Sequence, residues 1–344
     1  MKALDDIIKQ KEVSQASLLK LPGVTGIDVG YKYVGGQRTD EVSIRVMVTK
    51  KKKTVPVKQR IPAKIKGIKT DVIQRIFEPL TLRKPVADAT PVPDNKKYDP
   101  LQGGISIGPD REINGYVYAG TLGCIVTDKA TGEPRLLSNF HVMAVDDSWK
   151  AGDAMVQPSK VDGGTDADQI GTLAKAVLSN HVDGALSTVE GRGTDCAIVD
   201  IGKVKGTATA ALNAAVRKRG RTTLLTYGFV DAVNGTVKID YGDGIGAKTL
   251  TDQIGIRPDT AHNDIFSDHG DSGSAVVDAD NNVIGLLFAG SPDGYTYINL
   301  IANVLSELDI EVCTKAKTRK KIPKKKAKVK HHPSPKKKTP ADRS

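Results

Sequence analysis

The sequence Gly-Asp-Ser-Gly-Ser at residues 270–274 places Ser272 in a turn flanked by glycines. Upstream, the apolar stretch Leu-Leu-Ser-Asn-Phe-His-Val at residues 136–142 contains His141, and Asp195 opens a third apolar run. A serine, a histidine and an aspartate at the edges of strand-like segments are the parts of a serine nucleophile system. The intervals of 54 and 77 residues leave room for several strands between them.

The residue types suit acyl-transfer chemistry. A serine hydroxyl is a weak nucleophile at neutral pH, so Ser272 needs a base, and His141 is the candidate. A buried carboxylate would orient the imidazole and stabilise its charged form, and we assign this role to Asp195. A turn rich in glycine lets two backbone N–H groups face a developing oxyanion, and we assign that hole to Gly270 and Ser272.

Each motif also has a purely structural interpretation. The glycine-serine stretch suits an ordinary turn, His141 could be a satisfied core histidine, and Asp195 could simply begin a strand. Asp200 is a rival carboxylate, but it would end the strand that Asp195 begins. Ser274 is a rival nucleophile, but Ser272 is the serine with a glycine next to it on one side and the Gly-Asp turn on the other. Together, in this order, the three motifs favour the catalytic interpretation.

The charge of the chain is unevenly distributed. The 344 residues carry a net charge of +11, made of +10 in residues 1–99, −12 in residues 100–314 and +13 in residues 315–344. The predicted catalytic region is therefore acidic, although the whole chain is basic. The Lys-rich segment 315–344 has too little apolar sequence to form a core, so we expect a disordered tail. It is either a solubilising tail or a tether to nucleic acid or another polyanion.

Cysteine usage and hydropathy bear on the environment of the protein. The three cysteines, Cys124, Cys196 and Cys313, give no disulfide framework, and Cys124 and Cys196 lie in apolar runs typical of a core. We see no signal peptide or transmembrane segment, so we expect a reducing, cytoplasmic location. No His or Cys pairs have the spacing of metal ligands, and we expect neither a metal nor another cofactor.

The pattern of apolar residues predicts two folded parts. Residues 1–83 form a small α+β domain, residues 84–100 are a proline-rich linker, and residues 101–314 contain many short strands typical of a sandwich or barrel. In the first part we expect a helix over 2–20, strands over 24–34, 41–48 and 68–76, and a short helical piece over 57–64. A closing helix is expected over 298–308.

These stretches resemble a known family. Residues 121–141, 195–199 and 270–275 are similar to the three signatures of chymotrypsin-like serine peptidases, whose catalytic residues also follow the order His, Asp, Ser. The resemblance covers about residues 100–310 and implies two packed β-barrels with the active site between them. It also implies that residues 283–291 form the strand that binds the substrate backbone.

A narrower resemblance is to bacterial peptidases related to the plant narrow-leaf protein, carried by residues 21–32 and 220–223. Phe266 stands where the family often places the floor of its specificity pocket, so cleavage after Lys or Arg is not implied. Phe288 stands where a small serine is common and could narrow the cleft. With about a hundred residues before the barrel, Asp271 is not expected to pair with a freed N-terminus. It could pair with an internal arginine or only shape the turn.

We therefore expect a mainly β protein, with a double β-barrel, that acts as a serine endopeptidase on protein or peptide substrates. Two alternatives stay open. One is a scaffold that keeps the peptidase fold with little activity. The other is a protein that binds polyanions through its basic tail and to which the peptidase domain is attached.

Overall fold

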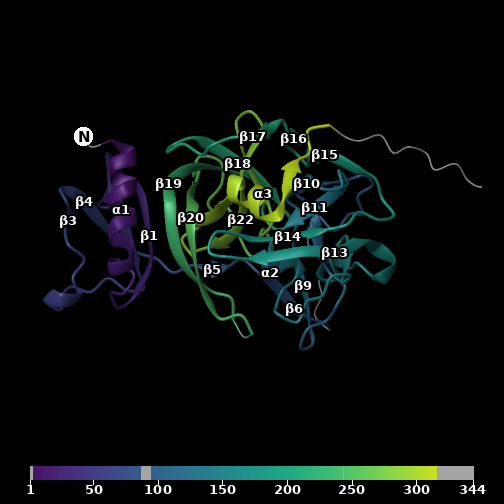
Figure 1. Cartoon of the computed structure of the whole chain (residues 1–344), viewed down its shortest axis with the longest axis horizontal. Helices are drawn as coiled ribbons and strands as arrows, with labels where there is room; N and C mark the ends of the chain where they lie inside the picture. Colours follow the sequence, from purple (N-terminus) through teal and green to yellow (C-terminus); the bar gives the residue numbers. More distant parts are fainter. Residues whose placement is uncertain (1–2, 87–93, 243, 316–344) are drawn as a thin grey trace, which may run out of the picture.

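The computed structural model describes residues 3–86, 94–242 and 244–315 (Figure 1). Strands make up nearly half of these residues, and all but one small sheet of them belong to two large sheets, which confirms the mainly β class. The tail predicted over 315–344 lies, apart from Lys315, outside the described residues. Within the described part of the chain, no helix has the length and apolar content needed to span a membrane.

The larger sheet closes on itself to form the C-terminal barrel. Six of its strands follow one another from β18 to β19, and β18 also pairs with β19, which completes the ring. The barrel strands, in sheet order, are β18 (Ala215–Gly220), β21 (Ala275–Asp278), β22 (Asn282–Gly290), β23 (Thr296–Leu300), β20 (Ala247–Pro258) and β19 (Leu224–Asp240). Two short strands, β5 (Glu78–Pro79) and β17 (Gly206–Thr207), add to β22.

The second sheet consists mainly of strands from residues 106–187, with β6 and β24 at its ends. Its strands, in sheet order, are β24 (Ile310–Val312), β10 (Cys124–Asp128), β11 (Pro134–Ser138), β14 (Asp183–Ser187), β13 (Gln169–Leu178), β12 (Ala154–Val156), β8 (Ser106–Pro109), β9 (Tyr116–Thr121) and β6 (Leu82–Pro85). A small separate sheet contains β16 (Gly202–Lys203), β15 (Thr194–Ile198) and β7 (Leu101–Gly103). The described residues after 100 thus build most of two large sheets, in the region where the resemblance implies two packed β-barrels.

The helices are few and short. They are α1 (Leu4–Leu18), α2 (Phe140–Met143) and α3 (Ile301–Leu308), with 3-10 turns at Val57–Gln59, Lys160–Asp162 and Asp166–Asp168. Helix α3 places Ile301, Val304 and Leu308 in the core, where they contact apolar residues of both barrels. It begins at Ile301, slightly later than the closing helix expected over 298–308.

The N-terminal elements occur in the predicted order, although β2 begins at Gln37 rather than 41 and the helical piece expected over 57–64 is only Val57–Gln59, and they then join the barrel. Helix α1 covers β1 (Val24–Val34) and β2 (Gln37–Val48), and β4 (Ile68–Gln74) and β3 (Lys64–Ile65) continue the sheet. The alternating apolar residues of β1 and β2 pack against α1 through Ile7 and Leu18. Because β1 pairs with β19, the N-terminal part and the C-terminal barrel share one sheet.

A buried ion-pair network reinforces that junction. The guanidinium of Arg45 donates two hydrogen bonds to Asp28, at 2.7 and 2.8 Å, and one to Asp231, at 2.5 Å. Arg45 also donates to the Tyr295 hydroxyl, and the Tyr297 hydroxyl donates to Asp28. Both carboxylates are thus paired and hydrogen-bonded, as buried charges must be. The network connects β1 and β2 with β19 and β23.

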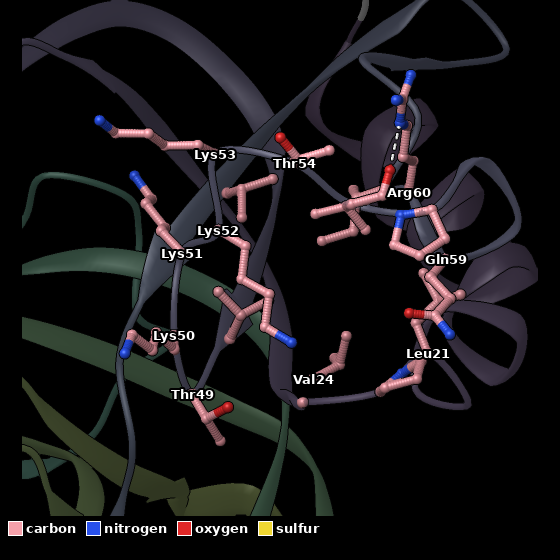
Figure 2. A pocket seen from close by; sticks show the side chains of 17 residues that line it. Leu21, Val24, Thr49, Lys50, Lys51, Lys52, Lys53, Thr54, Gln59 and Arg60 are labelled. Atoms are coloured by element: carbon pink, nitrogen blue, oxygen red, sulfur yellow. Dashed lines mark hydrogen bonds between the residues drawn. The ribbon is translucent and has the colours of Figure 1, made fainter.

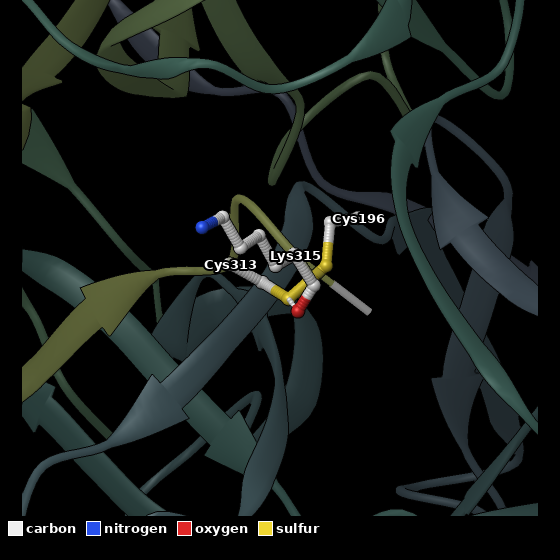
Figure 3. The surroundings of a disulfide bond; sticks show 3 residues. All are labelled: Cys196, Cys313 and Lys315. Carbon is white, nitrogen blue, oxygen red and sulfur yellow. Dashed lines mark hydrogen bonds between the residues drawn. A yellow bond between two sulfur atoms is a disulfide. The ribbon is translucent and has the colours of Figure 1, made fainter. Parts of the chain in front are cut away.

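The cysteines differ from the prediction. Cys196 on β15 and Cys313, which follows β24, form a disulfide (Figure 3), so the expectation of no disulfide is wrong. Because 117 residues separate the two cysteines, the local sequence around each does not indicate the pairing. Cys124 is a free, buried thiol, as expected. The cytoplasmic location stays a prediction.

Candidate active site

His141 stands at the end of a strand that faces the C-terminal barrel. Strand β11 ends at Ser138, and the short helix α2 carries His141 with an exposed fraction of only 3%. Its Nδ1 lies 2.5 Å from Oδ2 of Asp183, and its backbone N–H donates to Oδ1 of the same carboxylate at 3.2 Å. This two-point contact fixes both the position and the orientation of the imidazole.

The prediction that Asp195 orients His141 is therefore wrong, because Asp183 occupies that place. Strand β14 begins at Asp183 and pairs directly with β11, so its first residue lies beside the loop that carries His141. Asp195 lies on β15, which pairs with β7 and β16 in the small separate sheet. The order His, Asp, Ser along the chain is kept with the new assignment.

Asp183 is held by polar groups from both barrels. Its backbone N–H donates to the side chain of Asn299 at 3.1 Å, and its carbonyl oxygen accepts from Asn139 at 2.7 Å. The amide of Asn299 also donates to Gln253 at 2.7 Å. Burial, followed by the neighbouring Asp183 carboxylate, raises the pKa of Tyr241 well above its ordinary value, so this phenol stays neutral. The carboxylate of Asp183 itself is fully buried.

The turn that carries Ser272 requires its glycines. Gly270 and Gly273 have φ angles of +97° and +93°, a conformation that residues with a Cβ rarely adopt. A Cβ on Gly273 would also lie 2.2 Å from the carbonyl oxygen of Thr121. The rival serine, Ser274, donates to the Asp271 carbonyl at 2.6 Å and is thus engaged within the turn.

The Asp271 side chain is the internal anchor of this turn. It accepts backbone N–H groups of Thr222, Thr223 and Asp268 at 2.9 to 3.1 Å, and the Thr223 hydroxyl at 2.6 Å. The fully buried ammonium of Lys218 lies 3.2 Å from it. Asp271 thus pairs with an internal cation, a lysine rather than the arginine considered from sequence. Burial lowers the pKa of Lys218, and the Asp271 carboxylate opposes that effect.

The nucleophile turn contacts the sheet that carries His141. The N–H of Thr121 donates to the carbonyl oxygen of Ser272 at 2.8 Å. A Cβ on Gly120 would lie 2.5 Å from the side chain of Val142, the residue after His141, and 3.1 Å from the Ser272 carbonyl. The backbone thus brings the serine turn and the histidine helix together at the end of β9.

The hydroxyl of Ser272 is not hydrogen-bonded to His141 in this structure. Its Oγ lies 3.4 Å from the carbonyl oxygen of Phe288, on β22. Among the described residues, Nε2 of His141 is buried and has no hydrogen-bond partner. Of the two N–H groups assigned to the oxyanion hole, that of Gly270 donates to the carbonyl oxygen of Leu80 at 2.8 Å. Sequence reasoning did not single out Leu80.

The two phenylalanines of the expected cleft have different surroundings. Phe266 is fully buried in an apolar cluster that also contains Leu80 and Val216. Phe288 packs in another cluster, with Phe77 and Tyr297, away from the one that holds Leu80. Its ring therefore does not fill the space beside Phe266.

A basic pocket of about 890 Å³ lies in the N-terminal part (Figure 2). It is lined by residues 21–24, 48–56, 59–61 and 72, which include four consecutive lysines, Lys50 to Lys53. In Figure 2 the Lys52 side chain extends toward Val24, whereas those of Lys51 and Lys53 point away from it. This pocket contains none of the residues around Ser272, so it is separate from the candidate active site.

Comparisons with known proteins identify structural neighbours only. No family model and no curated protein matches the sequence. Protease A of Thermobifida fusca is similar over 62% of this chain and 98% of its own, with 19% identity and a TM-score of 0.46. A glutamic acid specific serine protease covers 62% and 100%, with 20% identity and a TM-score of 0.45. The chymotrypsin of Cellulomonas bogoriensis covers 62% and 98%, with 18% identity and a TM-score of 0.44. These structural neighbours of the chain are serine proteases.

Proposed function

We propose that the chain is a serine endopeptidase with Ser272 as nucleophile, His141 as base and Asp183 as the residue that orients the base. The observation that carries this proposal is the buried His141–Asp183 pair beside a glycine turn that presents Ser272. Asp183 accepts the Nδ1 proton, which leaves Nε2 of His141 as the free acceptor for the serine proton. The unpartnered Nε2, among the described residues, is consistent with that role.

In the proposed reaction the Ser272 hydroxyl first leaves the Phe288 carbonyl. Rotation about the Cα–Cβ bond of Ser272 would move its Oγ from the Phe288 carbonyl toward His141, at the modest cost of changing a rotamer. Ser272 then attacks the scissile carbonyl, and the proton passes to His141 and on to the leaving amine. The N–H groups of Gly270 and Ser272 stabilise the oxyanion. Water releases the acyl group in the second half of the reaction.

A fluorophosphonate probe and one pair of variants test this proposal. The probe should label Ser272, and Ser272→Ala should lower peptide hydrolysis by about 10³-fold or more, because removal of a triad member leaves only binding and the oxyanion hole. Ser274→Ala is the matched control and should keep its labelling. Unchanged hydrolysis in Ser272→Ala would reject the assignment.

The second candidate is a binding or scaffold protein of low activity. It is favoured by the Ser272 hydroxyl facing Phe288 and by the engagement of the Gly270 N–H with Leu80. Absence of probe labelling would favour it.

The polyanion tether through residues 315–344 also stays a prediction. Deletion of that segment should weaken DNA binding and flatten its salt dependence if the tether exists. The narrower relation to the narrow-leaf peptidases likewise stays a prediction.

A further inference from the structure

Residues 78–82 link the two large sheets, with β5 added to β22 of one sheet and β6 paired with β9 of the other. Strand β5 pairs antiparallel with β22, with Pro79 opposite Ala289 and Glu78 opposite Gly290. The next residue, Leu80, donates its N–H to the carbonyl oxygen of Phe288 at 3.3 Å. An extended peptide on a sheet edge is a common mode of peptide recognition. Here the occupied edge is the strand beside the Ser272 turn.

The carbonyl of Leu80 points at the group that would stabilise an oxyanion. Its oxygen accepts the Gly270 N–H at 2.8 Å, a distance suited to an oxyanion donor. The Leu80 side chain is 5% exposed and packs in the cluster that contains Phe266 and Ile284. A Cβ on Gly290 would lie 2.9 Å from Leu80, so the glycine leaves the space that the side chain fills. The backbone of Leu80 is thus held by a hydrogen bond, and its side chain by apolar packing.

Beyond Leu80 the chain crosses to the other barrel. The carbonyl oxygen of Thr81 lies 2.9 Å from Nδ1 of His269, which donates to it. Strand β6 then pairs antiparallel with β9, with Leu82 opposite Ala119. In Figure 1, β5 accordingly lies beside β22 and β6 beside β9. The Leu80–Thr81 bond is therefore the peptide bond that spans the two halves of the site.

We propose that residues 78–82 are the protein's own substrate and that Ser272 cleaves the Leu80–Thr81 bond within the same chain. This inference rests on the proposed function. Oγ of Ser272 bonds to the Leu80 carbonyl carbon, its proton moves to His141, and the C–N bond to Thr81 breaks as His141 returns the proton to the new amine. Water then hydrolyses the Leu80 ester, which frees the Leu80 carboxylate and restores Ser272. Before cleavage, Leu80 occupies the Gly270 N–H that another substrate would need.

The seating of Leu80 also indicates a substrate preference. Its side chain belongs to an apolar core cluster that also contains Val216, Phe266 and Leu287. An aliphatic side chain of leucine size fits it, whereas a charged side chain would be buried there without a partner. We therefore assign the enzyme a preference for peptides with leucine or methionine before the scissile bond.

Cleavage should leave the two pieces associated. Residues 1–80 remain paired with the barrel through β1 and β19, and the Arg45 network joins the same two parts. The expected product is a complex of fragments 1–80 and 81–344 that elutes together and separates only on denaturation. The new N-terminus should read Thr81-Leu82-Arg83.

Self-cleavage is tested on the purified full chain. The wild type should yield the two fragments at a rate independent of protein concentration, and Ser272→Ala should stay intact even when mixed with wild type. Leu80→Asp should slow cleavage by about 100-fold or more, because the apolar cluster cannot solvate a carboxylate. Leu80→Met should cleave at nearly the wild-type rate. Ile76→Asp adds the same charge at an exposed site and is the matched control.

Two further measurements separate this inference from the proposed function. A wild type that hydrolyses leucyl peptides while Leu80–Thr81 stays intact would overturn the inference alone. A wild type that hydrolyses no peptide and whose Ser272 is not labelled by the probe would overturn both the inference and the proposed function. Amide hydrogen exchange in Ser272→Ala tests the seating without catalysis. The Leu80 and Gly270 amides should exchange slowly, and faster by at least tenfold in the Ser272→Ala, Leu80→Asp chain. Fast exchange of the Leu80 and Gly270 amides in both chains would refute the observed contacts of Leu80.

Discussion

The substitution Asp183→Asn tests the identity of the orienting carboxylate. The two oxygens of Asp183 face two donors of His141, its backbone N–H at 3.2 Å and Nδ1 at 2.5 Å. Asparagine offers one oxygen and one NH₂ group of nearly the same shape. If its oxygen keeps the backbone contact, its NH₂ faces Nδ1, and the imidazole must carry its proton on Nε2. That tautomer cannot accept the proton of Ser272.

The expected loss in kcat is about 10⁴-fold, the effect of the same change in a chymotrypsin-like triad, which corresponds to about 5.4 kcal/mol. The fold should persist, because Asn299 and Asn139 contact the backbone of residue 183 rather than its side chain. Hydrolysis of a leucyl peptide measures the loss, both in the wild-type chain and in the Leu80→Asp chain. The KM should change little.

The matched control is Asp195→Asn, which should retain kcat within a few-fold, since β15 lies in the small separate sheet. If Asp195→Asn lost about 10⁴-fold while Asp183→Asn remained active, the assignment of Asp183 would be refuted. Circular dichroism of each variant guards against loss of the fold.

Three other predictions concern stability and thiol chemistry. Arg45→Met should lower the free energy of unfolding by about 3–5 kcal/mol in urea, because it removes the cation paired with the buried Asp28 and leaves Asp231 with the more distant Arg257, at 3.7 Å; a loss below 1 kcal/mol would contradict that picture. Burial lowers the pKa of Lys11 to about 8 from 10.5, so between these pH values the folded chain binds fewer protons than the unfolded chain and becomes more stable as pH rises. Between those pH values the free energy of unfolding of the wild type should rise by about 3 kcal/mol relative to that of Lys11→Met. A difference between the two proteins that does not change with pH would refute the lowered pKa. Burial also raises the pKa of Cys124 to about 12, so iodoacetamide at pH 8 should leave the native protein unlabelled and label one thiol after denaturation without reductant. Labelling of Cys196 or Cys313 in that sample would contradict the disulfide.

Local sequence was sufficient for the features that depend on neighbouring residues. The glycines around Ser272 identify a turn with two positive φ angles, and the alternation in residues 24–34 gives the bounds of β1 as observed. The apolar run before His141 likewise predicts β11, which ends three residues before the histidine. These features follow from backbone conformation and the period of apolar side chains, which short segments encode.

The identity of the acid could not be obtained in that way. Asp183 and Asp195 both precede apolar residues at the start of a strand, so their local patterns are equivalent. The difference lies in strand order: β14 pairs with β11, whereas β15 joins another sheet. The Cys196–Cys313 disulfide depends in the same way on long-range packing.

The contacts of Leu80 are the clearest case of a feature that depends on the tertiary structure. In the sequence it is one apolar residue near a proline, about 190 positions before the turn whose N–H it contacts. Its role arises because the N-terminal sheet continues the C-terminal barrel, which directs the following segment along β22. Conformation within a segment is determined by neighbouring residues. Contacts between segments depend on how sheets pair and pack across the whole chain, and it is this pairing that brings Leu80 to Gly270 and Asp183 to His141.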